Sequence, residues 1–176
     1  ALVNYSRSVD YGMRFLTEND IDFNKLSKMM GEPKDFLSYL DSHLDNNAKS
    51  HEAIFFLAQA LGGVINLKRD DMGLVSNLPI VKGLFDWVCS KSPNINFGAC
   101  DIFYGAYQAQ RPLMLGGNPE KGKEIFLKVI KRVPNNWLAR VSYMQYYLIP
   151  QGDEEGFQEQ EKYLAKFAKE HSKDLV

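Results

Sequence analysis

The chain has 176 residues, of which 45% are hydrophobic and 24% charged, so it can bury a core and is not a disordered tail. Its 21 Lys and Arg residues nearly balance its 22 Asp and Glu residues. This balance argues against a dedicated nucleic-acid-binding protein, because such proteins need an excess of basic residues.

Apolar residues recur at helical spacing along nearly the whole chain. Tyr5, Val9, Met13 and Leu16 mark one face of a first helix. No segment alternates strictly between apolar and polar residues with hairpin turns between runs. The sequence therefore predicts an all-α protein of antiparallel helices. Further helices are predicted at 23–30, 33–44, 49–67, 72–90, 97–110, 119–133, 137–148 and 153–170.

The most apolar stretch, 53–67, is too short for a membrane span, which needs about 18–20 apolar residues. Gln59 and Asn66 also interrupt it, and we interpret it as a core helix. The first residues after Ala1 lack the charged segment and apolar run of a signal peptide.

Two segments repeat at an offset of 41 residues. Both contain a Phe, a Val and a closing Pro-Asn: Lys82, Leu84, Phe85, Val88, Pro93 and Asn94 match Lys123, Ile125, Phe126, Val129, Pro134 and Asn135. The tetratricopeptide pattern explains this spacing, because its small residues let paired helices approach while its Phe fills the gap between pairs. An unrelated helical bundle with a chance match is the alternative.

The tetratricopeptide positions are occupied by Gly105, Gly122, Phe126, Val129 and Pro134. The interval from Gly105 to Gly122 is about five residues longer than the pattern, so we expect an enlarged loop at 112–117. We predict one helical-repeat domain over 1–176. It comprises N-terminal helices at 1–47 and helix pairs at 48–94, 95–135 and 136–171, which form a short α-α superhelix.

The stretch 102–158 contains a series of short motifs: Arg111-Pro112, Leu115-Gly116-Gly117-Asn118-Pro119, Phe126, Tyr146-Tyr147 and Asp153. With these motifs it resembles the T component associated with TRAP-type (tripartite ATP-independent periplasmic) transporters. Gly122 stands where that family usually has Ala, which bears on the shape of a cavity rather than on the fold.

The resemblance implies a protein of the bacterial periplasm or cell envelope, usually a lipoprotein, that contacts the membrane through a lipid anchor. It also implies two binding partners. One is the periplasmic solute-binding subunit of a TRAP transporter, and the other is a hydrophobic or amphiphilic organic ligand in an apolar cavity.

Aromatic residues gather in the helices that the repeat places on its inner surface, and most of them fit core packing. Some Tyr side chains could instead line a cavity, because each has an apolar ring and a polar hydroxyl. Arg111 either stabilises its helix end or pairs with an acid such as Asp153, or it holds a ligand carboxylate. The ligand-binding candidates are Tyr104, Tyr107, Arg111, Tyr143 and Tyr147.

No enzymatic chemistry can be assembled from the sequence. His43, His51 and His171 are too dispersed for a metal-ligand motif, and we predict neither a metal site nor a cofactor. The run Gly116-Gly117-Asn118-Pro119 reads as a helix start, with Asn118 as N-cap, and not as a phosphate loop.

The two cysteines, Cys89 and Cys100, lie on either side of Pro93-Asn94. They either form a disulfide or are free buried thiols.

Two functions are compatible with the sequence. The first is a non-enzymatic accessory protein of a TRAP-type transport system that binds the solute-binding subunit and a hydrophobic organic ligand. The alternative is a general tetratricopeptide-like scaffold for protein–protein interaction, without a small-molecule site. A closed aromatic cavity favours the first, and an open groove with polar walls favours the second.

Overall fold

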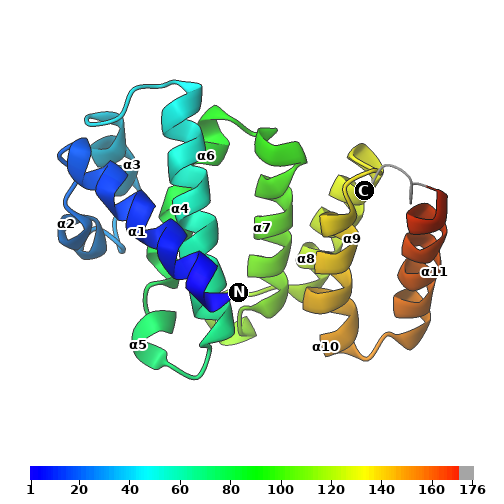
Figure 1. Cartoon of the computed structure of the whole chain (residues 1–176). Helices are drawn as coiled ribbons and strands as arrows, with labels where there is room; N and C mark the ends of the chain where they lie inside the picture. Colours follow the sequence, from blue (N-terminus) through cyan, green and yellow to red (C-terminus); the bar gives the residue numbers. More distant parts are fainter. Residues whose placement is uncertain (171–176) are drawn as a thin grey trace. The chain divides into compact units, whose positions relative to one another are not determined.

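Each predicted run of helical periodicity corresponds to helix in the computed structural model, which describes residues 1–170 (Figure 1). These residues contain no strand, so the all-α prediction is confirmed. The chain divides into two compact units, one spanning Ala1–Pro93 and the other beginning at Asn94. This division falls one residue before the predicted boundary between the first two helix pairs. Two statements remain predictions: that the chain forms a single domain over 1–176, and that its helix pairs form a superhelix.

The first unit is built around its longest helix. Helix α4 packs against both α1 and α6, and Gly12 on α1 lies so close to Leu57 on α4 that a Cβ there would be 2.6 Å from the Leu57 side chain. The unit comprises α1 (Leu2–Glu18), α2 (Phe23–Lys28), α3 (Pro33–Asp41), α4 (Ala48–Leu67), α5 (Met72–Val75) and α6 (Leu78–Lys91).

Side-chain caps set where these helices begin. The carboxylate of Asp22 accepts a hydrogen bond from the backbone N–H of Asn24 at 2.8 Å, and the amide oxygen of Asn47 accepts one from Ser50 at 2.9 Å. Each of these bonds satisfies a backbone donor that the helix itself leaves without a partner.

One predicted helix, 72–90, is two helices in the structure. Asp71 caps a short α5, and α6 then begins afresh with Pro79 in its first turn. A proline is well suited to a first turn and disrupts a helix interior, because it lacks an N–H and clashes with the preceding turn. Its position therefore explains the interruption after Val75.

The second unit packs α7 against α8 and against the helices that follow. Helix α7 begins at Ala99, two residues later than predicted, because Asn96, Phe97 and Gly98 have left-handed φ angles of 45°, 55° and 93°. The unit comprises η1 (Ile95–Phe97), α7 (Ala99–Gln110), η2 (Leu113–Leu115), α8 (Pro119–Arg132), α9 (Trp137–Tyr143), the π-helical turn η3 (Met144–Leu148), α10 (Ile149–Gln151) and α11 (Glu154–Glu170). Residue 171, the predicted end of the third pair, lies outside the described residues.

The repeat is visible in the bounds of two helices. Helices α6 and α8 both have 14 residues, and both their first and their last residues are offset by 41. Phe85 and Phe126, the predicted equivalents, are both buried. The residues that follow the helices, Ser92 and Val133, have nearly the same backbone angles, φ −132° and ψ 68° against φ −129° and ψ 70°.

Helices α7 and α8 approach each other closely at Gly122. A Cβ at this position would be 2.8 Å from the Gly105 carbonyl oxygen and 2.9 Å from the Ala109 backbone nitrogen. Both distances are far below van der Waals contact with atoms that cannot rotate away. Glycine at position 122 is therefore a requirement of this packing.

We find no helix among residues 1–170 that could cross a lipid bilayer.

Candidate functional site

The five predicted ligand-binding residues come from three places in the second unit: α7, the residue that follows it, and the α9–η3 segment. The structure separates them into two groups. Tyr143 and Tyr147 belong to the buried core that includes Ile102 and Ala109 of α7. Tyr104, Tyr107 and Arg111 are half-buried, and on α7 they share a face opposite to Ile102 and Ala109.

The buried group is a stack of aromatic rings. Tyr143 and Tyr147 are one helical turn apart, with ring centroids 5.5 Å from each other and planes inclined by only 13°. The ring of Phe126, from α8, lies 5.8 Å from that of Tyr143. These rings fill the space between α7, α8 and α9, which is the role that the repeat assigns to its Phe.

The hydroxyl of Tyr147 has a charged partner. It donates a hydrogen bond of 2.6 Å to the Oε1 carboxylate oxygen of Glu120, in the first turn of α8. This bond, together with burial, raises the pKa of Tyr147 from 10.0 to about 12. The ammonium group of Lys123 lies 5.4 Å from the centre of the same ring. Tyr147 therefore joins η3 to α8 as a neutral phenol over the ordinary pH range.

Burial also raises the pKa of Tyr143, and the nearby carboxylates of Asp153 and Glu120 act in the same direction. Both phenols are therefore held in the neutral form in a packed core. The pair is suited to packing and to hydrogen bonding.

The half-buried group combines aromatic rings with a cation. The ring of Tyr107 lies 5.8 Å from that of Phe103, and Phe103 lies 5.3 Å from Tyr104. The guanidinium of Arg111 is positioned 5.1 Å from the centre of the Tyr107 ring. A cation next to aromatic faces can bind a carboxylate while the rings contact an alkyl chain.

A π-helical turn interrupts the helix that the sequence predicts as continuous over 137–148. Such turns contain one extra residue and are frequent at functional sites. Here the side-chain amide of Gln110, at the end of α7, donates a hydrogen bond of 2.7 Å to the backbone carbonyl of Tyr146 within the turn. This contact fixes the end of α7 against the aromatic stack.

The predicted loop at 112–117 is present and contains the 3₁₀ turn η2. It is closed by backbone hydrogen bonds, including Gly116 to Leu113 at 2.9 Å and Gly117 to Pro112 at 3.1 Å. The amide oxygen of Asn118 then accepts a hydrogen bond from the backbone N–H of Lys121, as expected of an N-cap.

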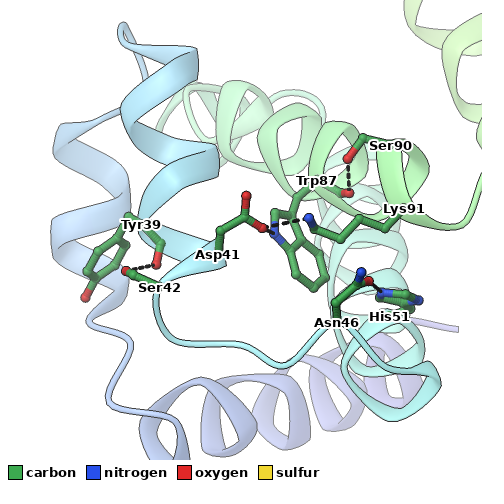
Figure 2. Close-up of polar contacts among 8 residues, drawn as sticks. All are labelled: Tyr39, Asp41, Ser42, Asn46, His51, Trp87, Ser90 and Lys91. Carbon is green, nitrogen blue, oxygen red and sulfur yellow. Dashed lines mark hydrogen bonds and ion pairs between the residues drawn. The ribbon is translucent and has the colours of Figure 1, made fainter.

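Polar contacts join three helices of the first unit (Figure 2). The indole N–H of Trp87, on α6, donates a hydrogen bond of 2.8 Å to the Asp41 carboxylate at the end of α3. Lys91 forms an ion pair of 2.8 Å with the same oxygen, and its hydrogen bond lowers the pKa of Asp41.

A second set of hydrogen bonds is centred on His51 of α4, whose ring lies edge-on to that of Trp87 with centroids 5.7 Å apart. Its Nε2 lies 2.8 Å from the Asn46 amide oxygen and its Nδ1 lies 3.2 Å from the Ser92 hydroxyl. Because an amide oxygen only accepts hydrogen bonds, Nε2 is the donor in the contact with Asn46. The two sets of contacts provide partners for the polar groups of the buried Trp87 and His51, and they tie α3 and α4 to α6, which is a structural role.

Two hollows lie on the first unit, along α1 and at the α1–α2 turn. The larger has a volume of about 420 Å³ and is lined by residues between Met13 and Asn24. The smaller, of about 160 Å³, is lined by Arg7, Asp10, Tyr11 and Arg14. None of the five predicted ligand-binding residues lines either hollow.

Neither cysteine is a free thiol, and both Cys89 and Cys100 are disulfide-bonded. Of the two alternatives for these residues, the structure has the disulfide. Among residues 1–170, no group of three or more His, Cys, Asp or Glu side chains could hold a metal ion. His171 lies outside the described residues.

Three residues of this region were missed by sequence reasoning: Glu120, Lys123 and Gln110. An acidic residue in the first turn of a helix is common, so Glu120 by itself does not indicate a hydrogen bond with a residue 27 positions away. Asp153, considered as a partner for Arg111, instead accepts a hydrogen bond from the backbone N–H of Gly156 and caps α11.

Comparison with known proteins supports the resemblance seen in the motifs. The family model described as the TRAP transporter T-component matches residues 1–173. No curated protein matches the chain. Because the family match covers nearly the whole chain, this protein belongs to the TRAP transporter T-component family.

Proposed function

We propose that this protein is a non-enzymatic accessory of a TRAP-type transport system and that it binds the periplasmic solute-binding subunit. This proposal rests on the family match over residues 1–173. A component of a transport system acts through contacts with its other components, so a protein partner is the first requirement. We further propose that it works in the bacterial periplasm or envelope, held at the membrane by a lipid anchor.

An exposed apolar pair on α9 supports a protein partner. Leu138 and Val141 are about half exposed, and their spacing of three places them on one face of the helix. Exposed apolar side chains on a rigid helix are suited to a protein interface, because they lose contact with water when the partner binds. We propose that this face contributes to binding of the solute-binding subunit.

The test is capture of the purified solute-binding subunit of the same transport system. We expect saturable capture by the wild-type chain and at least tenfold weaker capture by a Leu138→Asp, Val141→Asp double variant. Met72→Asp is the matched control, because Met72 is also an exposed apolar helix residue but lies in the first unit. Capture that both variants leave unchanged would exclude the α9 face, and no capture by wild type would exclude the partner.

We also propose a site for a hydrophobic or amphiphilic organic acid, formed by three of the predicted residues, Tyr104, Tyr107 and Arg111. Tyr107 and Arg111 offer a ring and a cation 5.1 Å apart, which matches an alkyl chain ending in a carboxylate. Tyr104 lies on the same face of α7. Tyr143 and Tyr147 lie in the core with Ile102 and Ala109 of the opposite face, so they support α7 and do not contact the ligand.

Native mass spectrometry with palmitate as the probe tests this site. We expect one palmitate per chain, with binding lost in Arg111→Ala and in Tyr107→Ala. Tyr11→Ala is the control, because Tyr11 is an exposed tyrosine beside Arg14 in the first unit, with a ring–guanidinium distance of 5.7 Å. If palmitate never binds, or if it binds all variants equally, the alternative of an interaction scaffold without a small-molecule site replaces this part of the proposal.

A further inference from the structure

We infer that the turn formed by Leu113, Met114 and Leu115, called the apolar tip below, inserts into the headgroup–acyl boundary of a phospholipid bilayer. The tip would give the protein a membrane contact of its own, separate from any lipid anchor and from the face proposed to bind the solute-binding subunit.

The first observation is the exposure of three consecutive apolar side chains. Leu113 is 74% exposed, Met114 90% and Leu115 57%. A single exposed apolar residue is ordinary on a protein surface, but a contiguous apolar patch indicates a partner or a membrane. These three residues lie in one 3₁₀ turn, so their side chains project from a single short segment.

The second observation is that the turn is held in this shape. The backbone N–H groups of Leu115 and Gly117 both donate to the Pro112 carbonyl, at 2.9 and 3.1 Å. Gly116 has a left-handed φ of 85°, which L-residues with side chains rarely adopt. At Gly117, a Cβ would lie 1.8 Å from the Arg111 carbonyl oxygen, so only glycine fits. The backbone hydrogen bonds and the two glycines therefore hold the tip in its exposed position.

The third observation is charge. Arg111 is the only charged residue between positions 102 and 119, and Lys121 and Lys123 follow in the first turns of α8. The carboxylate of Glu120, the acidic residue nearest to the tip in sequence, accepts the hydrogen bond of Tyr147. The apolar tip is flanked in sequence by the basic residues Arg111 and Lys121. This matches a bilayer with anionic lipids, since the apolar residues enter the acyl boundary while the cations meet the headgroups.

The size of the tip favours a bilayer over a protein partner. A stable protein interface buries about 800 Å² per partner and involves about 20–30 residues on each side. Three side chains on a convex turn fall far short of this. A bilayer has no fixed shape to match, so each apolar side chain contributes as it leaves water. Binding by the tip alone would be weak and reversible, comparable to a single acyl chain at about 10⁴ M⁻¹, and would become effective with a second membrane signal.

Co-sedimentation of the 176-residue chain with vesicles tests the inference. The vesicles contain three parts phosphatidylethanolamine and one part phosphatidylglycerol. We expect wild type to sediment with them and a Leu113→Ser, Met114→Ser, Leu115→Ser variant to lose at least tenfold in partitioning. The matched control is Val3→Ser, Leu67→Ser, Met72→Ser, which removes three exposed apolar side chains from the first unit and should bind like wild type.

A second variant keeps the test independent of folding defects in the triple variant. Met114→Trp should give blue-shifted fluorescence with these vesicles and quenching by brominated lipid, whereas Met72→Trp should give neither. Absence of vesicle binding by wild type, equal binding of the two triple variants, or an unquenched Trp at position 114 would each overturn the inference. Because the α9 face is untouched in the tip variant, its capture of the solute-binding subunit should be unchanged.

Discussion

Replacing Gly122 with Ala adds a Cβ where α7 and α8 approach each other closely, and we expect it to destabilise this protein. In the interior of α8, Ala should gain about 1 kcal/mol over Gly from helix propensity alone. Overpacking opposes this gain, because the new Cβ would come within 2.8 Å of both the Ala109 Cβ and the Gly105 carbonyl oxygen. Overpacking costs about 1–3 kcal/mol, and this site belongs at the upper end because backbone atoms form the contact.

The net expectation is a loss of about 1–2 kcal/mol in the free energy of unfolding, or a fall of at least about 4 °C in Tm for a unit of this size. Thermal unfolding followed by circular dichroism measures it. Gly62→Ala is the matched control, because Gly62 is inside α4 and its new Cβ would meet only Val81, at 3.5 Å. That variant should be more stable than wild type by about 0.5–1 kcal/mol. If Gly122→Ala is stabilised to the same extent, this result would contradict the claim that α7 and α8 lie too close at position 122 to admit a Cβ.

Three further predictions concern the core, a titration and the disulfide. Phe126→Ala should cost about 3–5 kcal/mol in urea unfolding, because the ring is fully buried, and a change below about 1 kcal/mol would contradict its repeat role. Tyr147 should remain a neutral phenol until about pH 12. The difference in phenolate absorbance between wild type and Tyr147→Phe measures its titration, and a titration near pH 10 would contradict the Glu120 hydrogen bond. Because folding raises this pKa, the stability that the bond provides is fully present below pH 10 and is lost as pH rises from 10 to 12. Thiol labelling of the denatured protein should count no thiols before reduction and two after it, and two thiols without reduction would exclude the disulfide.

Helical periodicity was sufficient to predict most of the fold because apolar spacing and capping residues act locally. Asn118 and Pro119 mark the start of α8 in the sequence and occupy its N-cap and first position in the structure. The errors occurred where local signals competed. The helix predicted at 72–90 runs through Pro79, although a proline is better suited to the first turn of a new helix, as in α6.

The candidate site was harder to predict because its geometry depends on contacts between distant residues. Tyr104 and Tyr147 are both aromatic residues on helices of the repeat, and nothing in their local sequence shows that one is half-buried and the other in the core. The π-helical turn also rotates the residues after Tyr143 relative to a regular helix, and no periodicity rule anticipates it.

The central claim is that this T-component binds the solute-binding subunit of its TRAP system, and a direct measurement of affinity tests it best. Isothermal titration of the purified subunit into the wild-type chain should give a saturable isotherm with a Kd in the micromolar range or tighter and a stoichiometry of one subunit per chain. The same titration into the Leu138→Asp, Val141→Asp variant should give at least a tenfold weaker Kd. An isotherm without binding for the wild-type chain, at concentrations of about 100 μM, would contradict the claim.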